Sequence, residues 1–424
     1  MKTALVLGGT AAHIALLNEL KSRGYHTILI DYYDNPVAKP YADEHLPEST
    51  LDQERVLQIA CERNADLVIS ACVDQANLVA AYAMEGLGKK PPYSYAIADA
   101  ITNKGNMKQI MLDNGIPTAK YLYVEDGQSP DISDFTFPIM VKPADACGAA
   151  GVKKCETPEQ FEEYFPFAVA SSRNRRAVVE EYVSGVEVSA YCFVSKGKAI
   201  MLATAERLSV IDGGQSVIKC YGTIMPSSVG NSALRKIEKA ATDIANAYQL
   251  DNTPLHVQAL VDGEHINIIE FAPRVGGGLS YLTIKNRTGF DIISASVDSW
   301  EGKEVPVSVH ENSLLQVVHL IYAKPGVFSR IEGVERVRTS GAVDALFEYK
   351  TSGMTLGTAT ASAGRAGACV ISGSTTSEIK EKAHKVFEEI SVVGMGESDL
   401  TRRDLCLNNE MDAYEKRILM KGAE

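Results

Sequence analysis

IEFAPRVGGG (269–278) joins a carboxylate, an arginine and three successive glycines at the end of an apolar run. Glu270 offers hard oxygen to Mg²⁺, and Arg274 offers a guanidinium to a phosphate. The glycines Gly276 to Gly278 would let backbone N–H groups approach an anion closely. The stretch therefore predicts a metal–phosphate site, although a surface Glu–Arg pair beside a glycine turn would have the same sequence.

The residues before this stretch predict a β-hairpin. LHVQALV (255–261) and INIIEF (266–271) are strand-like runs on either side of DGEH (262–265). His256 and Gln258 lie on one face of the first strand, and Ile268 and Glu270 lie on one face of the second strand. A three-residue loop from Gly263 to His265 would place Gln258 opposite Glu270, whereas a slip of one residue would separate them.

A second candidate anion site lies upstream of the hairpin. FPIMVKP (137–143) predicts a strand, and ADACGAAGV (144–152) predicts a loop of small residues that also contains Cys147. Lys142 adds a positive charge at the strand end. The loop lacks the GK[ST] ending of a Walker A motif, and a flexible surface loop would look the same.

The N-terminus reads as a parallel α/β unit. TALVL (3–7), TILID (27–31) and DLVIS (66–70) are short apolar runs, and a helical stripe follows Gly8-Gly9-Thr10. Asp31 stands about 20 residues after that turn, as in dinucleotide-binding folds, yet the G-x-G-x-x-G fingerprint is absent. A nicotinamide oxidoreductase, an anion site at the helix N-terminus and a plain structural turn all remain open.

Composition narrows the classes of partner. The 424 residues carry 42 Lys and Arg against 54 Asp and Glu, a net charge of −12. Such an acidic chain is not expected to bind nucleic acid or an anionic membrane. No segment approaches the ~18 apolar residues of a membrane helix, and Gly8-Gly9 interrupts the one stretch that imitates a signal peptide. Eight cysteines without a CxxC pair indicate free thiols, so we expect a cytoplasmic protein.

Taken in order, these motifs resemble one superfamily. Lys104, GIP (115–117), VKP with its small-residue loop, EEYVSGVE (180–187) and IEFAPRVGGG are similar to the motif series of ATP-grasp enzymes, over roughly residues 1 to 300. SAGRAGACVISG (362–373) precedes a helix predicted to close the chain, and this tail resembles the C-terminal domain of biotin carboxylase-like members. The resemblance implies an α/β ATP-grasp fold with a Rossmann-like pre-ATP-grasp domain, a mobile lid and a C-terminal α+β domain. The predicted parts are the pre-ATP-grasp domain 1–95, a linker helix 96–117, the lid 118–190, the second ATP-grasp subdomain with the metal site 191–300 and the C-terminal extension 301–424.

The resemblance also implies roles for individual residues. Lys104 and Lys142 would contact the ATP phosphates, and Arg274 would stabilise the transferred phosphoryl group. Mg²⁺, which Mn²⁺ could replace, would bind Glu270 with help from Gln258. The remaining residues would bind ATP through the lid loop (Gly148, Gly151), the adenine-pairing hinge (Glu180, Glu181, Tyr182, Val183) and the ribose hydroxyls (Glu187).

The activity implied is that of an ATP-dependent ligase. A small carboxylate would be activated as an acyl phosphate and joined to an amine, with release of ADP and phosphate. Gly8, Gly9, Arg207 and the glycines of 276–278 would border the substrate, although Arg207 could equally be a structural ion-pair partner. As in many relatives, a homodimer could form.

Two positions depart from the family pattern. Gln258 stands where a second Glu is usual, and Ala272 stands where Asn is usual. We therefore expect weaker metal binding. The alternatives are a small-molecule kinase of the same fold, or an ATP-binding protein with little turnover. Ala at the Asn position also resembles some amino-acid ligases, which favours an amino-acid substrate.

Overall fold

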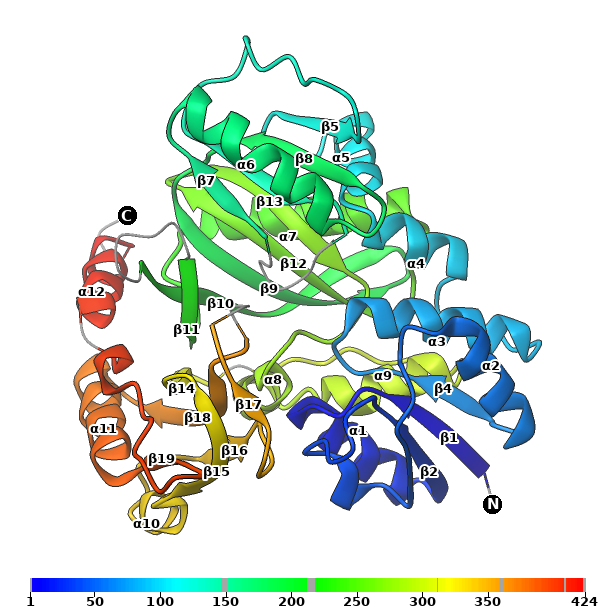
Figure 1. Cartoon of the computed structure of the whole chain (residues 1–424), viewed down its shortest axis with the longest axis vertical. Helices are drawn as coiled ribbons and strands as arrows, with labels where there is room; N and C mark the ends of the chain where they lie inside the picture. The colour runs from blue at the N-terminus through cyan, green and yellow to red at the C-terminus, as the bar shows by residue number, and fades with distance from the viewer. Residues whose placement is uncertain are drawn as a thin grey trace.

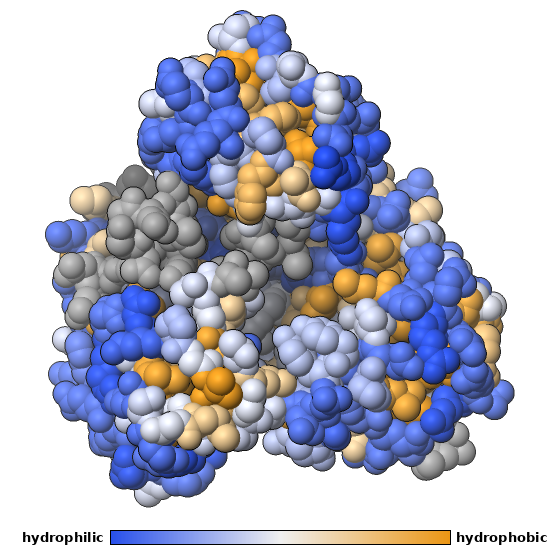
Figure 2. Space-filling model, viewed as in Figure 1, coloured by the Kyte–Doolittle hydropathy of each residue, from blue (hydrophilic) through white to orange (hydrophobic). Residues whose placement is uncertain are grey.

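The computed structural model describes residues 2–145, 151–211, 218–310, 312–358, 362–407 and 409–421. Within these residues the strands form four sheets. Figure 1 shows a lid at the top, a large sheet beneath it, and two lower lobes formed by the two ends of the chain. The face seen in Figure 2 is mostly hydrophilic, with hydrophobic residues in small separate patches. None of the helices in these ranges is long and apolar enough to cross a membrane.

The N-terminal lobe is the parallel α/β unit that the sequence predicts. Its sheet has the order β3-β2-β1-β4 with parallel pairs throughout. The strands are β1 (Lys2–Leu7), β2 (Tyr25–Ile30), β3 (Glu44–Leu46) and β4 (Leu67–Ile69), and the helices around them are α1 (Ala11–Ser22), α2 (Gln53–Glu62) and α3 (Asp74–Gly86), with a 3-10 turn η1 (Lys39–Tyr41).

The glycine turn after β1 is filled by the protein's own side chain. His13 is completely buried, and a Cβ on Gly8 would lie 2.9 Å from its ring. Its Nδ1 lies 2.8 Å from Thr10 Oγ1 and its Nε2 lies 3.1 Å from Ser70 Oγ. Burial lowers the pKa of His13 to about 4, so the ring is neutral at physiological pH. The sequence left three interpretations of this turn open: a nicotinamide site, an anion site and a plain structural turn. This geometry favours the structural turn.

The lid is a small antiparallel sheet with its own hydrophobic core. Its strand order is β5-β8-β6-β7, and Ile139, Val141 and Val179 point into a cluster with Phe161. Helices α4 (Tyr95–Thr102) and α5 (Lys104–Asp113) lead into it, and its elements are β5 (Tyr121–Glu125), β6 (Ile139–Pro143), β7 (Lys153–Cys155), α6 (Pro158–Ser171) and β8 (Arg176–Glu181). This core is separate from the main one, so the lid is a packing unit of its own.

An eight-stranded sheet connects the middle of the chain to its tail, in the order β13-β12-β9-β10-β11-β14-β18-β16. The amphipathic helix α7 (Asn231–Ala247) packs on β9, β10, β12 and β13. The strands are β9 (Val186–Ser195), β10 (Lys198–Ile211), β11 (Ile218–Met225), β12 (Thr253–Asp262), β13 (His265–Ala272), β14 (Leu315–Tyr322), β16 (Ala345–Glu348) and β18 (Arg365–Gly373), and helices α8 (Ser280–Thr288) and α9 (Ile292–Trp300) separate β13 from β14.

The tail adds a smaller sheet of order β17-β15-β19 and three helices. These elements are β15 (Gly326–Glu332), α10 (Val334–Thr339), β17 (Thr355–Leu356), α11 (Thr376–Glu389), β19 (Ser391–Gly394), η2 (Arg403–Leu405) and α12 (Asn409–Lys421). The helix predicted to close the chain is α11, whose apolar face is buried as expected. That prediction was wrong about the end of the chain, because α12 follows and packs on the central sheet near β11 (Figure 1).

The predicted hairpin is present, but its loop differs from the prediction. Asp262 pairs with His265, so the loop has two residues rather than three. The register shifts beyond Ala259, where Ile269 is left as a bulge, and Gln258 then pairs with Glu270 as predicted. The short loop and the bulge together produce the register that a three-residue loop would give.

Candidate active site

Two lysines flank one buried carboxylate at the base of the lid. Glu180, near the end of β8, is 5% exposed. Its carboxylate accepts from Lys142 Nζ on β6 at 2.5 Å and lies 3.0 Å from Lys108 Nζ on α5. Lys108 also donates to Thr118 Oγ1, and Thr118 donates to the carbonyl of Ile268 on β13. Through Thr118, Lys108 therefore ties the Glu180 cluster to the central sheet.

The charges of this cluster set its protonation. Burial alone would raise the pKa of Glu180, but Lys142 and Lys108 lower it to about 2, so the carboxylate is ionised. Burial lowers the pKa of Lys108, and the Glu180 carboxylate acts in the opposite direction. Lys108 also lies within electrostatic reach of Glu270 on β13. The hydrogen-bond chain from Lys108 through Thr118 ends at Ile268, two residues before Glu270 on the same strand.

The carboxylates of the central sheet lie beside this cluster. Glu187 on β9 accepts from Arg207 Nη1 at 2.5 Å and from Gln258 Nε2 at 3.1 Å. The amide nitrogen of Gln258 donates to Glu187, and its Oε1 is the atom that can serve as a metal ligand. From the sequence, Arg207 could either border the substrate or form a structural ion pair. The structure shows the ion pair, with Glu187. In the described part of the chain, no three His, Cys, Asp or Glu side chains gather in a way that could hold a metal.

Arg274 lies in the loop after β13 and contacts a different lobe of the molecule. Its Nε donates to Asp74 Oδ1 at 2.6 Å, and Asp74 is the first residue of α3 in the N-terminal lobe. Its Nη1 donates to the Val275 carbonyl at 3.0 Å and lies 3.3 Å from His256 Nδ1. Burial and the Arg274 charge lower the pKa of His256 to about 3, so its ring is neutral and can accept this hydrogen bond.

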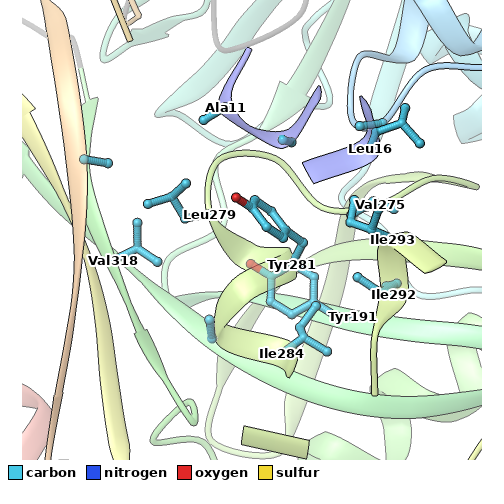
Figure 3. Close-up of a cluster of buried hydrophobic side chains, with 14 of the residues drawn as sticks. Ala11, Leu16, Tyr191, Val275, Leu279, Tyr281, Ile284, Ile292, Ile293 and Val318 are labelled. Atoms are coloured by element: carbon cyan, nitrogen blue, oxygen red, sulfur yellow. The ribbon is translucent and has the colours of Figure 1, made fainter. Parts of the chain in front are cut away.

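Hydrophobic packing fixes the loop that carries Arg274. Val275 and Leu279 are fully buried, and Figure 3 shows them on either side of Tyr281, with Tyr191 beneath. A Cβ on Gly276 would lie 2.4 Å from Tyr191 Cε1, so only glycine fits there. Tyr191 in turn stacks on His256 at a centroid distance of 5.2 Å.

The hinge segment has one amide left for a ligand. Glu181 N donates to the Lys120 carbonyl and Tyr182 N donates to the Pro138 carbonyl, both at 3.0 Å. Among the predicted hinge residues, and within the described backbone, only the amide of Val183 has no such bond. The side chain of Tyr182 packs under Lys154, whose Nζ lies 4.2 Å from the ring centroid.

The structure brings five of the predicted residues together, in two groups. Lys142 and Glu180 meet in the lid cluster, and Gln258, Glu270 and Glu187 meet on the central sheet. Gly151 is described, at the end of the lid loop, and Lys104 opens α5, whereas Gly148 and Cys147 lie outside the described residues.

Sequence reasoning missed Lys108 and Asp74. Lys108 stands four residues after Lys104 on one helix face, and Asp74 follows the carboxyl end of a parallel strand. In α/β sheets, ligand sites lie at the carboxyl ends of the strands. The position of Asp74 after β4 could therefore have identified it from the sequence.

The chain was compared with known proteins. Residues 135–282 match the ATP-grasp domain family, and residues 319–393 match the L-amino acid ligase C-terminal domain 2. The carbamoyl phosphate synthase large chain of Clostridium acetobutylicum is 22% identical over 323 residues, which cover 73% of this chain but only 29% of that relative.

Solved structures share the fold at low identity. The L-amino acid ligase of Bacillus licheniformis superposes with a TM-score of 0.73 and 18% identity, over 93% of this chain and 99% of that one. The biotin carboxylase domain dimer of Hydrogenobacter thermophilus 2-oxoglutarate carboxylase, a complex with MgADP, gives a TM-score of 0.76 and 16% identity, over 98% and 95% of the two chains. Both confirm the predicted fold. Residues 135–282 therefore carry an ATP-grasp domain, and the chain shares the architecture of ATP-grasp enzymes.

Proposed function

We propose that this protein is an ATP-dependent ligase that activates a small carboxylate as an acyl phosphate and joins it to an amine. One observation carries the proposal most directly. The buried Lys108–Glu180–Lys142 cluster of the lid is linked through Thr118 to β13, the strand that carries Glu270. Cations on one side and a metal-binding carboxylate on the other are the charges that the phosphates of metal-bound ATP require.

ATP would lie between the lid and the central sheet. Lys104 and Lys142 would contact its phosphates, because an ammonium group has three donors and Lys142 uses one of them on Glu180. Adenine would pair with the Val183 amide in the hinge, and Glu187 would bind the ribose. Gly151, together with Gly148, would bring the lid loop over the phosphates.

The residues present fit a metal held largely by ATP itself. Glu270 supplies a carboxylate and Gln258 an amide oxygen, and the remaining ligands would be phosphate oxygens. We propose Mg²⁺, or Mn²⁺ in its place. When bound, such an ion neutralises the charge that develops on the transferred phosphoryl group.

The chemistry has two steps. A carboxylate oxygen forms a bond to the γ-phosphorus as the bond to ADP breaks, which gives an acyl phosphate. The amine then attacks the carbonyl carbon, loses a proton and expels phosphate. Arg274 would stabilise the charge of the phosphoryl group in both steps, because its guanidinium is held 2.6 Å from Asp74 and cannot swing away. Lid closure would keep water from the intermediate.

An amino acid is the substrate class we propose. The match of residues 319–393 to an L-amino acid ligase domain supports it, as does Ala272 at the family's Asn position. Gly9 and the 276–278 loop would border the substrate. Arg207 would act indirectly, since it is bound to Glu187.

The test is release of ADP and phosphate from Mg·ATP with pooled amino acids, with Glu270→Gln as the control. We expect release that depends on one acid plus one amine, reduced by about 100-fold or more in the variant. ADP without free phosphate would identify a kinase. ATP binding without release across broad acid and amine libraries would identify a binding protein, and the absence of a three-carboxylate cluster among the described residues is what favours that alternative.

We further propose a cytoplasmic location and a homodimer. The proposed division of the chain is into residues 1–95, 96–117, 118–190, 191–300 and 301–424.

A further inference from the structure

One ion pair joins the N-terminal lobe to the arginine proposed to act on the phosphoryl group. Asp74 and Arg274 are 200 residues apart, and their carboxylate oxygen and Nε are 2.6 Å apart. The Arg274 side chain is only 11% exposed. A guanidinium buried this deeply needs a compensating charge, because it cannot lose its proton.

The hydrogen bonds of Arg274 involve two of its three guanidinium nitrogens. Nε is held by Asp74, and Nη1 is held by the Val275 carbonyl and faces His256. Within the described residues Nη2 is the one nitrogen of the group without a hydrogen bond. The three partners therefore fix the plane of the guanidinium and leave one end for a ligand.

Asp74 is the only charged group among these partners. Burial would raise its pKa, but the charge of Arg274 and their hydrogen bond keep that pKa below the ordinary value, so Asp74 is ionised at neutral pH. His256 is neutral and Val275 contributes only a carbonyl. Orientation of the guanidinium thus depends on a carboxylate that comes from another lobe.

We propose that Asp74 is a positioning residue, through which the N-terminal lobe aligns Arg274 for phosphoryl transfer. This inference rests on the proposed function and adds a residue that no motif of the ATP-binding half contains. It makes docking of the N-terminal lobe a condition for catalysis, because the lobe supplies a charge to the site.

A second ion pair between the same two parts of the chain provides the control. Asp298 on α9 accepts from Arg23 Nη1 of the N-terminal lobe, also at 2.6 Å. The exposed fractions of the two aspartate side chains are nearly equal, 31% for Asp74 and 32% for Asp298. Asp298→Asn therefore weakens lobe docking without touching Arg274.

The experiment compares Asp74→Asn, Asp74→Glu and Asp298→Asn in the full chain. We expect Asp74→Asn to lower kcat by about 100-fold with little change in KM for ATP, the scale of a reacting group displaced by about 1 Å. Asp74→Glu should recover part of the loss, and Asp298→Asn should keep the parent kcat. Equal kcat values in the parent and Asp74→Asn, or equal losses in the two Asn variants, would overturn the inference.

A second readout does not depend on turnover. The Nε–H signal of Arg274 in [¹⁵Nε]arginine-labelled protein, assigned with Arg274→Lys, should be protected from solvent exchange in the parent and in Asp298→Asn but not in Asp74→Asn. Equal protection in all of them would overturn the inference. Loss of protection in Asp74→Asn, with no ADP release from the parent, would instead overturn the proposed ligase.

Discussion

At the scale of single residues, Glu180 determines whether two lysines can lie side by side inside the protein. Lys142 and Lys108 both contact its carboxylate, and all three side chains are largely buried. Removing one member of such a group leaves an uncompensated buried charge, which costs about 3–5 kcal/mol. In the proposed function, the same cluster would hold Lys142 in place for the phosphates.

Glu180→Gln should therefore destabilise the chain by about 3 kcal/mol at pH 7. The folded-state pKa of Glu180, about 2, lies below its ordinary value of 4.5. Its contribution is therefore complete above pH 4.5 and is lost as the pH falls towards 2. Denaturant unfolding of both proteins from pH 7 to pH 3 should show the difference shrinking below pH 4.5.

Glu181→Gln is the matched control, because the neighbouring side chain is 31% exposed and its pair with Lys120 is long, at 4.0 Å. It should cost less than about 1 kcal/mol. A loss for Glu180→Gln that stayed constant across this pH range would contradict the assigned role of the carboxylate.

At the scale of elements, the β12–β13 hairpin pairs Gln258 with Glu270 and also brings Gln258 to Glu187. The amide of Gln258 thus separates two carboxylates. A Glu at that position, the usual residue in the family, would put like charges directly opposite each other across the strands. A bound cation would relieve the repulsion that remains after Arg207 has paired with Glu187.

Gln258→Glu should lower the melting temperature without metal and tighten the apparent Mg²⁺ affinity of the ATP complex by about tenfold. Thermal melts with and without Mg·ATP would measure both effects, with Gln258→Met as the uncharged control. If Gln258→Glu melts like the parent in the absence of metal, Gln258 does not separate Glu187 from Glu270 as described.

The same hairpin shows which features could be predicted from the sequence and which could not. Alternation of apolar and polar residues predicted its strands and faces, because that pattern is local. The bulge at Ile269 was not predicted, since nothing in the sequence distinguishes a three-residue loop from a two-residue loop with a bulge. Lys108 and Asp74 were missed for another reason: their partners Glu180 and Arg274 are 72 and 200 residues away. Only the folded chain brings these charges together.

At the scale of the whole molecule, α12 joins the end of the chain to the central sheet. Arg417 pairs with Glu206, whose side chain is 1% exposed, and its Nε donates to Ser228 Oγ at 2.8 Å. Tyr414 adds a hydrogen bond to the Pro226 carbonyl. The last helix thus supplies the charge that compensates a buried carboxylate on β10.

Arg417→Met should destabilise the chain by about 3–5 kcal/mol, because Glu206 would remain buried without its cation. Lys416→Met removes the same charge from an exposed position of α12 and should change stability by less than about 0.5 kcal/mol. Denaturant midpoints of the two variants would separate these cases. Equal midpoints would mean that α12 does not stabilise the sheet through this pair.

The most direct test of the ligase proposal follows one oxygen atom. The accepted carboxylic acid is labelled with ¹⁸O in its carboxylate and incubated with Mg·ATP and the amine, and the released phosphate is examined by ³¹P NMR. An acyl phosphate intermediate predicts one ¹⁸O per phosphate, and Glu270→Gln should slow its appearance. Phosphate without ¹⁸O would mean that water, and not the carboxylate, receives the phosphoryl group, which would contradict the proposed activity.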